Sequence, residues 1–356
     1  MKAGFVPALV TPLDEKGNLI ERSYRKQIED MIAAGAVGLL SMGSMGQQAF
    51  LTNSTCVEVA RVAVDAAAGR VPVFVGAMDC SIRRAAERML QEETCQISAI
   101  DIHSHVGPAH GNMPDNCIEN GSVPYLLRTM ELANIAISVN SSRYALMPRG
   151  SGYCVEGNRQ MVDLAEQYAK VYFWVIIDPH ETETFAQAAD LLQHPKALGV
   201  KIHPEEHEYS LLELGDKLFA FAAKHHAPLL GHSGAECCMP EIYSFFAEQY
   251  PEIPVIAAHL GSSFDADPNH HIRSILNNQT GNLYTDTSSI RSMLSNLLEY
   301  AVGMIGADHI LFGTDSSNYF SPCQRVRIDG AAISRFDKYQ ILRGNALKLF
   351  AKLDIT

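Results

Sequence analysis

Histidines and an aspartate that follow short apolar runs are the residues of this sequence best suited to chemistry. His103 and His105 stand two positions apart near the start of the longer C-terminal part of the chain. His232 follows Leu-Leu-Gly, His259 follows Ala-Ala, and Asp315 follows Phe-Gly-Thr. Imidazole and carboxylate groups together suit Zn, Mn, Fe or Ni. The set predicts a centre for one divalent cation that activates a water molecule.

The His-x-His spacing has a geometric meaning in a β-strand. Residues i and i+2 point to the same side of a strand, so His103 and His105 would face one cation. Singly, each residue also fits a structural role, such as a buried histidine or, for Asp315, a helix N-cap. Their joint placement favours the metal centre, with Asp315 also moving a proton and His259 orienting the water or stabilising a developing oxyanion.

The elements that must position these residues alternate between short apolar runs and longer amphipathic stretches, which is typical of βα units. Each predicted strand of the C-terminal part is followed by a helix-length segment, the last over 337–353. The eight predicted strands cover 99–102, 135–139, 172–177, 199–202, 228–231, 254–258, 282–285 and 310–313. Eight such units predict an α/β fold of the (β/α)8 TIM-barrel type, whose active sites lie at the C-terminal ends of the strands.

The N-terminal part predicts a partial α/β segment of about three βα units. Its strands are predicted at 5–10, 37–41 and 71–76, and its helices at 21–34, 54–68 and 81–93. We therefore divide the chain into a segment over 1–97 and a barrel over 98–356. An open parallel segment has an unpaired strand edge, so it would dock on the barrel, pair with a second copy in a homo-oligomer, or persist as a passenger of the fusion.

Composition restricts the partners. The chain has 356 residues and a net charge of -12, which argues against a nucleic-acid partner, because such binding depends on Lys and Arg. No apolar stretch reaches the roughly 18 residues of a membrane span. The eight cysteines form no CxxC pair, so free thiols in a reducing cytoplasm are expected. A small-molecule substrate is the remaining expectation.

Residues 98–356 resemble the amidohydrolase-related family, in the branch that includes aminocarboxymuconate-semialdehyde decarboxylase. The motifs that carry the resemblance are Asp-Ile-His-Ser-His (101–105), Gly-Val-Lys-Ile-His-Pro (199–204), Gly-His-Ser (231–233), Ala-His-Leu-Gly (258–261), Leu-Phe-Gly-Thr-Asp (311–315) and Gly-Asn-Ala-Leu-Lys-Leu-Phe (344–350). The resemblance implies that His103, His105, His232 and Asp315 bind the metal, with His259 as the acid–base histidine. Zn is expected first, with Mn or Fe as alternatives.

Two residues on the fourth predicted barrel strand could bind a second metal or the substrate. Some relatives carry a carboxylated lysine there that bridges two metals, and Lys201 lies on that strand, two residues before His203. A lysine that faces the substrate or forms a salt bridge is the expectation we favour over a second metal. Further substrate contacts are expected from loops at the same face, with Arg143, His180 and Arg291 as candidates. Arginine suits the bidentate binding of a carboxylate.

Residues 1–93 resemble the start of the dihydrodipicolinate synthase and N-acetylneuraminate lyase family. The motifs are Phe-Val-Pro-Ala-Leu-Val-Thr-Pro-Leu-Asp (5–14), Gly-Ser-Met-Gly-Gln (43–47) and Val-Pro-Val-Phe-Val-Gly (71–76). Members of that family form a Schiff base on a lysine in a later strand, and this chain leaves the pattern before that strand. The expected function is therefore a metal-dependent hydrolase. A metal-dependent non-oxidative decarboxylase is the alternative, a Schiff-base aldolase is the remote one, and a pseudoenzyme is the non-catalytic one.

Overall fold

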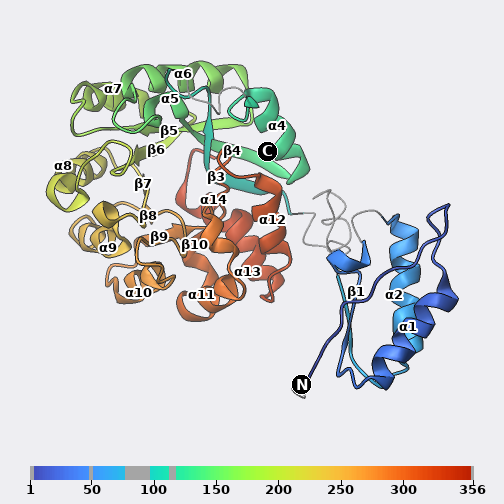
Figure 1. Ribbon diagram of the computed structural model, residues 1–356. Helices are drawn as coiled ribbons and strands as arrows, with labels where there is room; N and C mark the ends of the chain where they lie inside the picture. The colour runs from blue at the N-terminus through green and yellow to red at the C-terminus, as the bar shows by residue number, and fades with distance from the viewer. Residues whose placement is uncertain (1–3, 48–50, 77–96, 112–117, 354–356) are drawn as a thin grey trace. The chain divides into compact units, whose positions relative to one another are not determined.

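The computed structural model describes residues 4–47, 51–76, 97–111 and 118–353 (Figure 1). The chain divides into two compact units, Met1–Gln91 and Glu92–Thr356, which are described separately below. The helix predicted over 81–93 lies outside the described residues, as does most of the predicted junction. The boundary after residue 97 therefore stays a prediction. Among the described residues, no helix is both long and apolar enough to cross a membrane.

The larger unit is built on eight parallel strands, one for each run predicted from the sequence. Adjacent strands pair in chain order from first to last, as a barrel requires. The strands are β3 (Ala99–Val106), β4 (Ile135–Ser142), β5 (Val171–Ile176), β6 (Ala197–Ile202), β7 (Leu229–Gly231), β8 (Val255–Ala257), β9 (Leu283–Asp286) and β10 (Ile310–Leu311). They are rich in buried β-branched residues, because both faces of a parallel sheet are covered.

The first and last strands meet and close the ring. The backbone N–H of Ile102 donates to the carbonyl of Phe312 at 3.0 Å, and the N–H of Asp315 donates to the carbonyl of His103 at 2.8 Å. Ser104 and Ser316 form a parallel bridge just beyond. The ends of β3 and β10, which carry His103, His105 and Asp315, are therefore held together by backbone hydrogen bonds.

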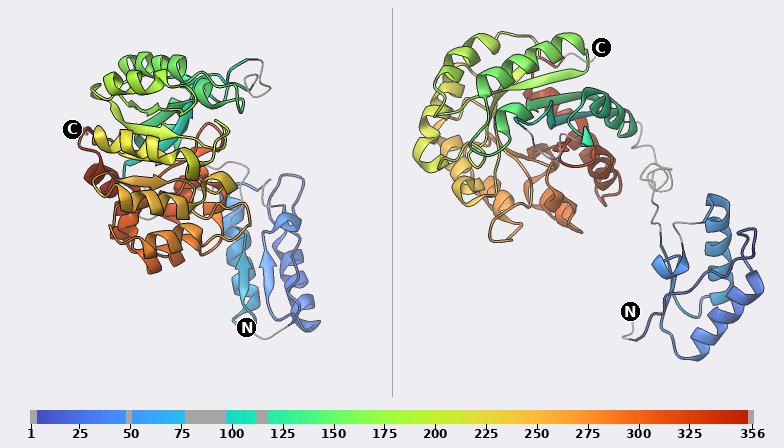
Figure 2. Two further views of the ribbon diagram at one scale, coloured as in Figure 1. Left: turned by 90° about the vertical axis from the view of Figure 1, so that its left-hand side faces the viewer. Right: turned by 45° about the horizontal axis from the view of Figure 1, so that its top comes forward.

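Helices surround the strands on the outside (Figure 2). The longer ones are α4 (Val123–Leu132), α6 (Cys154–Gln167), α7 (Glu183–Leu191), α8 (Leu211–Lys224), α9 (Pro240–Gln249), α10 (His270–Asn277), α11 (Leu297–Ile305) and α12 (Ser321–Asp329). Short turns of helix complete the set, namely α5 (Arg143–Leu146), α13 (Arg335–Tyr339) and α14 (Asn345–Leu349). The helix predicted over 337–353 is thus α13 and α14, joined by a π-helical turn over Gln340–Gly344.

Apolar side chains fill the interior of the barrel below the site. Ile100 and Ile102 from β3 pack in one buried cluster with Trp174 from β5 and Phe350 from the C-terminal segment. The indole N–H of Trp174 donates to the carbonyl of Ile102 at 2.7 Å, so the one tryptophan leaves no buried donor unpaired. Because the strands are parallel, the polar residues that follow them gather at one end of the barrel.

The smaller unit contains two helices and a two-stranded parallel sheet among its described residues. The helices are α1 (Glu21–Ala33) and α2 (Asn53–Ala67), and the strands are β1 (Leu39–Ser41) and β2 (Val73–Val75). The strand predicted over 5–10 is reduced to a single bridge between Ala8 and Leu40. Pro7 lacks the N–H that a sheet ladder needs, which explains the shortfall.

Candidate metal centre

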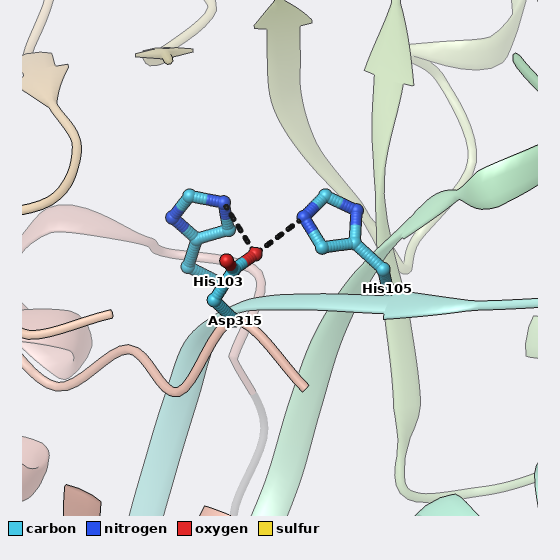
Figure 3. A group of neighbouring side chains, drawn as sticks. All are labelled: His103, His105 and Asp315. Atoms are coloured by element: carbon cyan, nitrogen blue, oxygen red, sulfur yellow. Dashed lines mark ion pairs between the residues drawn. The ribbon is translucent and has the colours of Figure 1, made fainter. Parts of the chain in front are cut away.

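Three of the predicted ligands converge at the open end of the barrel. Nε2 of His105 lies 2.9 Å from Oδ1 of Asp315, and Nε2 of His103 lies 3.8 Å from the same oxygen (Figure 3). All three side chains are nearly or fully buried. One ligand atom from each lies within 4.8 Å of the others. Ligand bonds of about 2.0–2.2 Å from one cation would span these separations, so the donor set fits a divalent metal.

The backbone at the site is held in uncommon conformations. Asp315 has φ 51° and His259 has φ 73°, a region that residues other than glycine rarely adopt. Such strain persists where the surrounding structure imposes it, and it is concentrated at functional sites. Gly313 permits the close approach of the last strand, because a Cβ there would lie 2.9 Å from the Cβ of His103.

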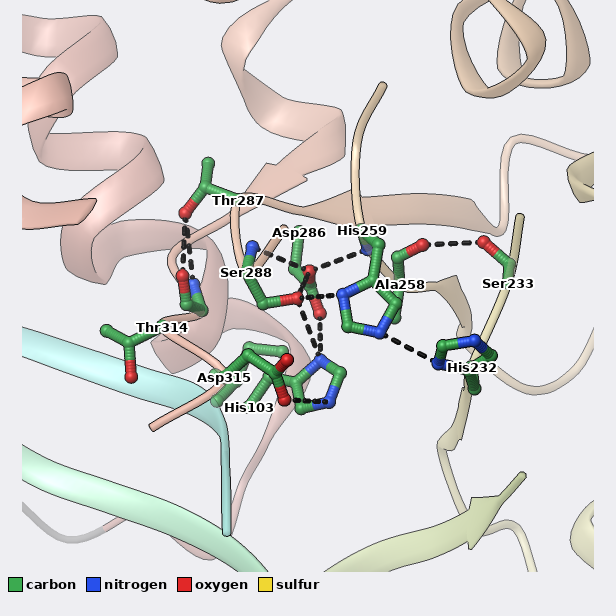
Figure 4. A network of polar contacts seen from close by, with 12 residues as sticks. His103, His232, Ser233, Ala258, His259, Asp286, Thr287, Ser288, Thr314 and Asp315 are labelled. Carbon is green, nitrogen blue, oxygen red and sulfur yellow. Dashed lines mark hydrogen bonds and ion pairs between the residues drawn. The ribbon is translucent and has the colours of Figure 1, made fainter. Parts of the chain in front are cut away.

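His103 is oriented by a carboxylate on the neighbouring strand. Its Nδ1 lies 2.7 Å from Oδ2 of Asp286, at the end of β9 (Figure 4). An Nδ1–H that donates to Asp286 leaves the lone pair on Nε2, the nitrogen that points to Asp315. Carboxylates in this position fix the tautomer of metal-binding histidines. Burial and the nearby Lys201 ammonium hold the pKa of His103 well below its ordinary value, so the imidazole is neutral, as metal binding requires.

Ser288 links this pair to the predicted acid–base histidine. Its hydroxyl donates to Oδ1 of Asp286 and lies 2.8 Å from Nδ1 of His259. The backbone N–H of His259 also donates to Asp286, at 2.9 Å. His103, His259 and Asp286 therefore form a second buried group of ligand types that shares His103 with the first. Burial holds the pKa of His259 well below its ordinary value.

The predicted fourth ligand, His232, has other partners in this structure. Its Nδ1 lies 3.0 Å from Nε2 of His259, and its Nε2 lies 3.0 Å from Oε2 of Glu205. Its ring also stacks on that of His203, with centroids 4.0 Å apart. Among the described residues, His232 is thus not grouped with the three converging ligands. The hydrogen bond from His232 lowers the pKa of Glu205 to about 2, and Arg149 adds to this effect.

Lys201 lies at the centre of the site. It is fully buried, and its Nζ lies 2.9 Å from Nε2 of His103. Burial lowers the pKa of this lysine to about 8, although Asp286 and Asp315 counteract the shift. The ammonium therefore faces the same nitrogen that would bind the cation, and a loaded centre requires Lys201 to turn toward another anion.

The three predicted substrate residues lie in different surroundings. Arg143 is buried, and its Nη1 lies 3.1 Å from Oδ1 of Asn120. Its charge helps to lower the pKa of His105, after burial, which is the larger cause. Arg143 also lines a cavity of about 470 Å³ together with Gly107 and Leu164. His180 and Arg291 are more exposed, and His180 lies beside Asp178 rather than among the converging ligands.

Sequence reasoning did not name Asp286, Ser288, Asp101 or Glu205. Asp286 ends β9 and could have been found by asking which polar residue follows each predicted strand. Asp101 accepts hydrogen bonds from the hydroxyl of Thr314 at 2.6 Å and from the N–H of His103 at 3.1 Å. Burial nevertheless raises the pKa of Asp101 to about 8.

Comparison with solved structures shows the same fold in several enzymes. A 5-carboxyvanillate decarboxylase from Sphingomonas paucimobilis matches with a TM-score of 0.56 at 13% identity, over 72% of this chain and 99% of that one. A dihydroxybenzoic acid decarboxylase from Polaromonas sp. JS666, solved with bound manganese, gives 0.55 at 16%, over 71% and 97%. A 4-oxalomesaconate hydratase from Rhodopseudomonas palustris gives 0.52 at 13%, over 71% and 96%. At these identities the likeness concerns the fold.

Sequence comparison separates the two parts of the chain. Residues 1–100 match the dihydrodipicolinate synthetase family. Within this part, 76 residues are 38% identical to 4-hydroxy-tetrahydrodipicolinate synthase from Escherichia coli K12, over 21% of this chain and 26% of that protein. The chain therefore spans about a quarter of that relative's length. Residues 100–352 match the amidohydrolase model. The chain belongs to the amidohydrolase family, and its barrel is that of an enzyme.

Proposed function

We propose that the barrel is a metal-dependent decarboxylase that removes CO2 from a small carboxylate molecule. His103, His105 and Asp315 would hold the cation. The observation that carries the proposal is the fully buried Lys201, whose Nζ lies 2.9 Å from Nε2 of His103. When a cation binds this nitrogen, the buried ammonium must turn toward another anion, and a substrate carboxylate beside the cation would supply one.

Charge balance favours an anionic substrate. A divalent cation and Lys201 bring three positive charges, while Asp315 and Asp286 bring two negative charges. A buried charge without a partner is costly, so the excess positive charge favours an anion next to the metal. The carboxylate of a substrate supplies that charge, whereas a neutral amide or ester does not.

The chain offers a source of protons for the carbon that loses CO2. The bound cation supplies Lewis acidity at an oxygen of the substrate. His232 lies between Nε2 of His259 and the carboxylate of Glu205, at 3.0 Å from each. When both ring nitrogens of His232 carry a hydrogen, one donates to His259 and the other to Glu205. We therefore assign His232 and His259 to hold the proton and to deliver it to the carbon that loses CO2. His232 becomes a fourth metal ligand only where its contact with Glu205 opens.

The solved relatives support this choice. Two of those compared above carry the name decarboxylase, one of them with bound manganese. We therefore give manganese, expected from the sequence only as an alternative, equal standing with zinc as the candidate metal. The residues up to about 97 we assign to a separate segment outside the catalytic barrel.

Hydrolysis remains the second candidate because of one contact. Asp315 lies 2.9 Å from Nε2 of His105, and its pKa is lowered by this hydrogen bond and by nearby positive charges, against the opposing effect of burial. A carboxylate that stays ionised beside the metal ligands can accept a proton from an attacking water.

Product analysis separates the two reactions. The chain, reconstituted with Mn²⁺ or Zn²⁺, is incubated with a panel of hydroxybenzoates and unsaturated dicarboxylates, and with amides, esters and lactones. Decarboxylation predicts one CO2 per product, uptake of a solvent deuteron at carbon and no incorporation of ¹⁸O from water. Turnover of the neutral panel alone, with ¹⁸O in the product, would replace this proposal by hydrolysis. Lys201→Met serves as the matched variant, because it keeps an unbranched side chain of similar bulk and removes the charge.

A further inference from the structure

A further group of metal-ligand side chains is buried in the barrel unit and shares no residue with the two groups described above. Cys154, Asp178 and His207 offer ligand atoms that lie within 4.8 Å of one another. They come from three different segments: Cys154 begins α6, Asp178 follows β5 and His207 follows β6. Cys154 is fully buried, Asp178 is 8% exposed and His207 is 6% exposed. The proposed decarboxylation uses none of the three.

The ring of His207 is not satisfied by either neutral tautomer. Its Nε2 lies 3.1 Å from the carbonyl oxygen of Ala145, so this nitrogen must carry a hydrogen. Its Nδ1 is buried, has no hydrogen-bond partner among the described residues, and lies 3.9 Å from Oδ2 of Asp178. A neutral ring therefore directs the Nδ1 lone pair at a carboxylate, across a gap too long for a hydrogen bond.

The thiol of Cys154 completes a donor set for a borderline-soft cation. Its Sγ lies 3.5 Å from Nε2 of His207 and 3.6 Å from the carbonyl oxygen of Ala145, so the ring of His207 must turn for Nδ1 and the thiolate to share one ion. Burial and the charges of Asp178 and Glu181 raise the pKa of this thiol, so without a cation it is neutral. Thiolate, imidazole and carboxylate together are ligands of Zn²⁺. We propose that Cys154, Asp178 and His207 form a second, structural zinc site, with water as the fourth ligand.

Binding of an ion requires the three ligand atoms to move closer together. Ligand bonds to Zn²⁺ are about 2.0–2.3 Å long and its structural sites are tetrahedral, so the ligand atoms of one ion lie about 3.3–3.8 Å apart. The ligand atoms of the present group lie within 4.8 Å of one another. The side chains would therefore rotate to bring these atoms together by up to about 1–1.5 Å.

The backbone around the three ligands is held in place independently of any ion. Glu181 accepts hydrogen bonds from the backbone N–H groups of Cys154 and Val155, at 3.0 and 3.3 Å. The hydroxyl of Thr184 accepts from the N–H of Asp178 at 3.1 Å. Ligands fixed in this way lose little freedom on binding, and such support is common around protein metal sites.

Asp178 lies beside an exposed side chain. Nδ1 of His180, which is exposed, lies 3.7 Å from Oδ1 of Asp178, whereas Cys154 is fully buried.

The site would stabilise the loops that carry the catalytic centre. His207 closes the turn that begins at His203, since its N–H donates to the carbonyl of His203 at 3.0 Å. His203 in turn stacks on His232. An ion on His207 would thus fix the segment against which His232 packs, and it would join that segment to the start of α6 and to the loop after β5.

Cobalt substitution tests the site without any measurement of turnover. Purified full-length chain is stripped of metal and titrated with Co²⁺. Thiolate bound to Co²⁺ gives an intense sulfur-to-cobalt charge-transfer absorption, which imidazole and carboxylate ligands do not give. We expect this absorption in the wild type and in His103→Ala/His105→Ala, and we expect its loss in Cys154→Ser. Cys237→Ser and Cys323→Ser are the matched controls and should keep it.

Two results would overturn the proposal. One is a wild type that shows no sulfur-to-cobalt absorption at saturating Co²⁺. The other is an absorption that survives Cys154→Ser but disappears in Cys237→Ser. Should Cys154→Ser fail to fold, His207→Asn keeps the thiol and is expected to weaken Co²⁺ binding at least tenfold. If the proposed decarboxylation is wrong, all these outcomes stay the same, because the cobalt absorption does not depend on catalytic activity.

Discussion

Oδ2 of Asp286 lies 2.7 Å from Nδ1 of His103, although 183 residues separate the two in the chain. The contact decides which ring nitrogen of His103 is free, because a hydrogen donated to Asp286 leaves Nε2 with its lone pair. That nitrogen points toward Asp315 and Lys201. The orientation of the proposed metal ligand therefore depends on a residue that would not itself bind the metal.

Asp286→Asn tests this dependence. An amide in place of the carboxylate no longer favours the Nδ1–H tautomer of His103, so metal affinity should fall by about 10–100-fold. Titration with Zn²⁺ against a competing chelator measures the change. Asp190→Asn, at an exposed position of α7, is the matched control and should leave the affinity as it is. Equal affinities for the Asp286 variant and the wild type would show that the pair has no such role.

His259→Gln separates metal binding from proton transfer. The side chain contacts Ser288 and His232 but is not grouped with His105 and Asp315. We expect the metal content to stay at the wild-type level and kcat to fall by about 10²–10⁴-fold, the usual contribution of a general acid or base. Metal analysis and steady-state kinetics on one preparation provide both values. Loss of the metal in this variant would instead make His259 a ligand.

Lys201→Met tests the charge argument for an anionic substrate. Removal of the ammonium should raise KM for a carboxylate substrate at least tenfold, while the metal content is retained or increases. Both KM and the metal content must be measured, because a lysine that bridges two metals would also change the metal content. If Lys201 instead held a second metal, the variant would lose one equivalent of metal, and this result would contradict the assignment.

The barrel should lose stability in acid through the ion pair between Glu299 and Arg327. Glu299 lies 2.6 Å from Arg327, and this hydrogen bond lowers its pKa from the ordinary 4.5 to about 2. A lowered pKa stabilises the folded state above pH 4.5, and the contribution disappears as the pH falls toward 2. After allowance for partial exposure, the pair is worth about 2 kcal/mol at pH 7.

Urea unfolding of Glu299→Gln measures that contribution. The free energy of unfolding should be lower than that of the wild type at pH 7, and the difference should shrink when both are compared near pH 3. Glu156→Gln removes a more exposed pair with Arg159 and is expected to change stability by well under 1 kcal/mol. A deficit for Glu299→Gln that is the same at both pH values would rule out the ion pair as its source.

The eight barrel strands could be predicted from the sequence because each is a buried run of apolar, often β-branched residues. Placement of His103, His105 and Asp315 followed from the rule that strand ends of one barrel meet at one face. The strand predicted over 5–10 was reduced to one bridge because Pro7 has no backbone N–H to donate.

Contacts between side chains of distant strands could not be predicted in the same way. The partners of His232 depend on the direction taken by the loop that carries Glu205, and local sequence does not encode that direction. For the same reason, His180 and Arg291 could be assigned to loops of the active face but not to a distance from its centre. The joint environment of Cys154, Asp178 and His207 likewise arises from three segments that are separate in the sequence.

The most direct test of the metal centre is elemental analysis of the full-length chain and of His103→Ala/His105→Ala, both purified without added metal. The account predicts that the wild type holds about one equivalent of Zn, Mn or Fe more than the double variant. The difference should persist after both proteins are reconstituted and desalted. Equal metal contents in the two proteins would contradict the claim that His103, His105 and Asp315 form a metal centre.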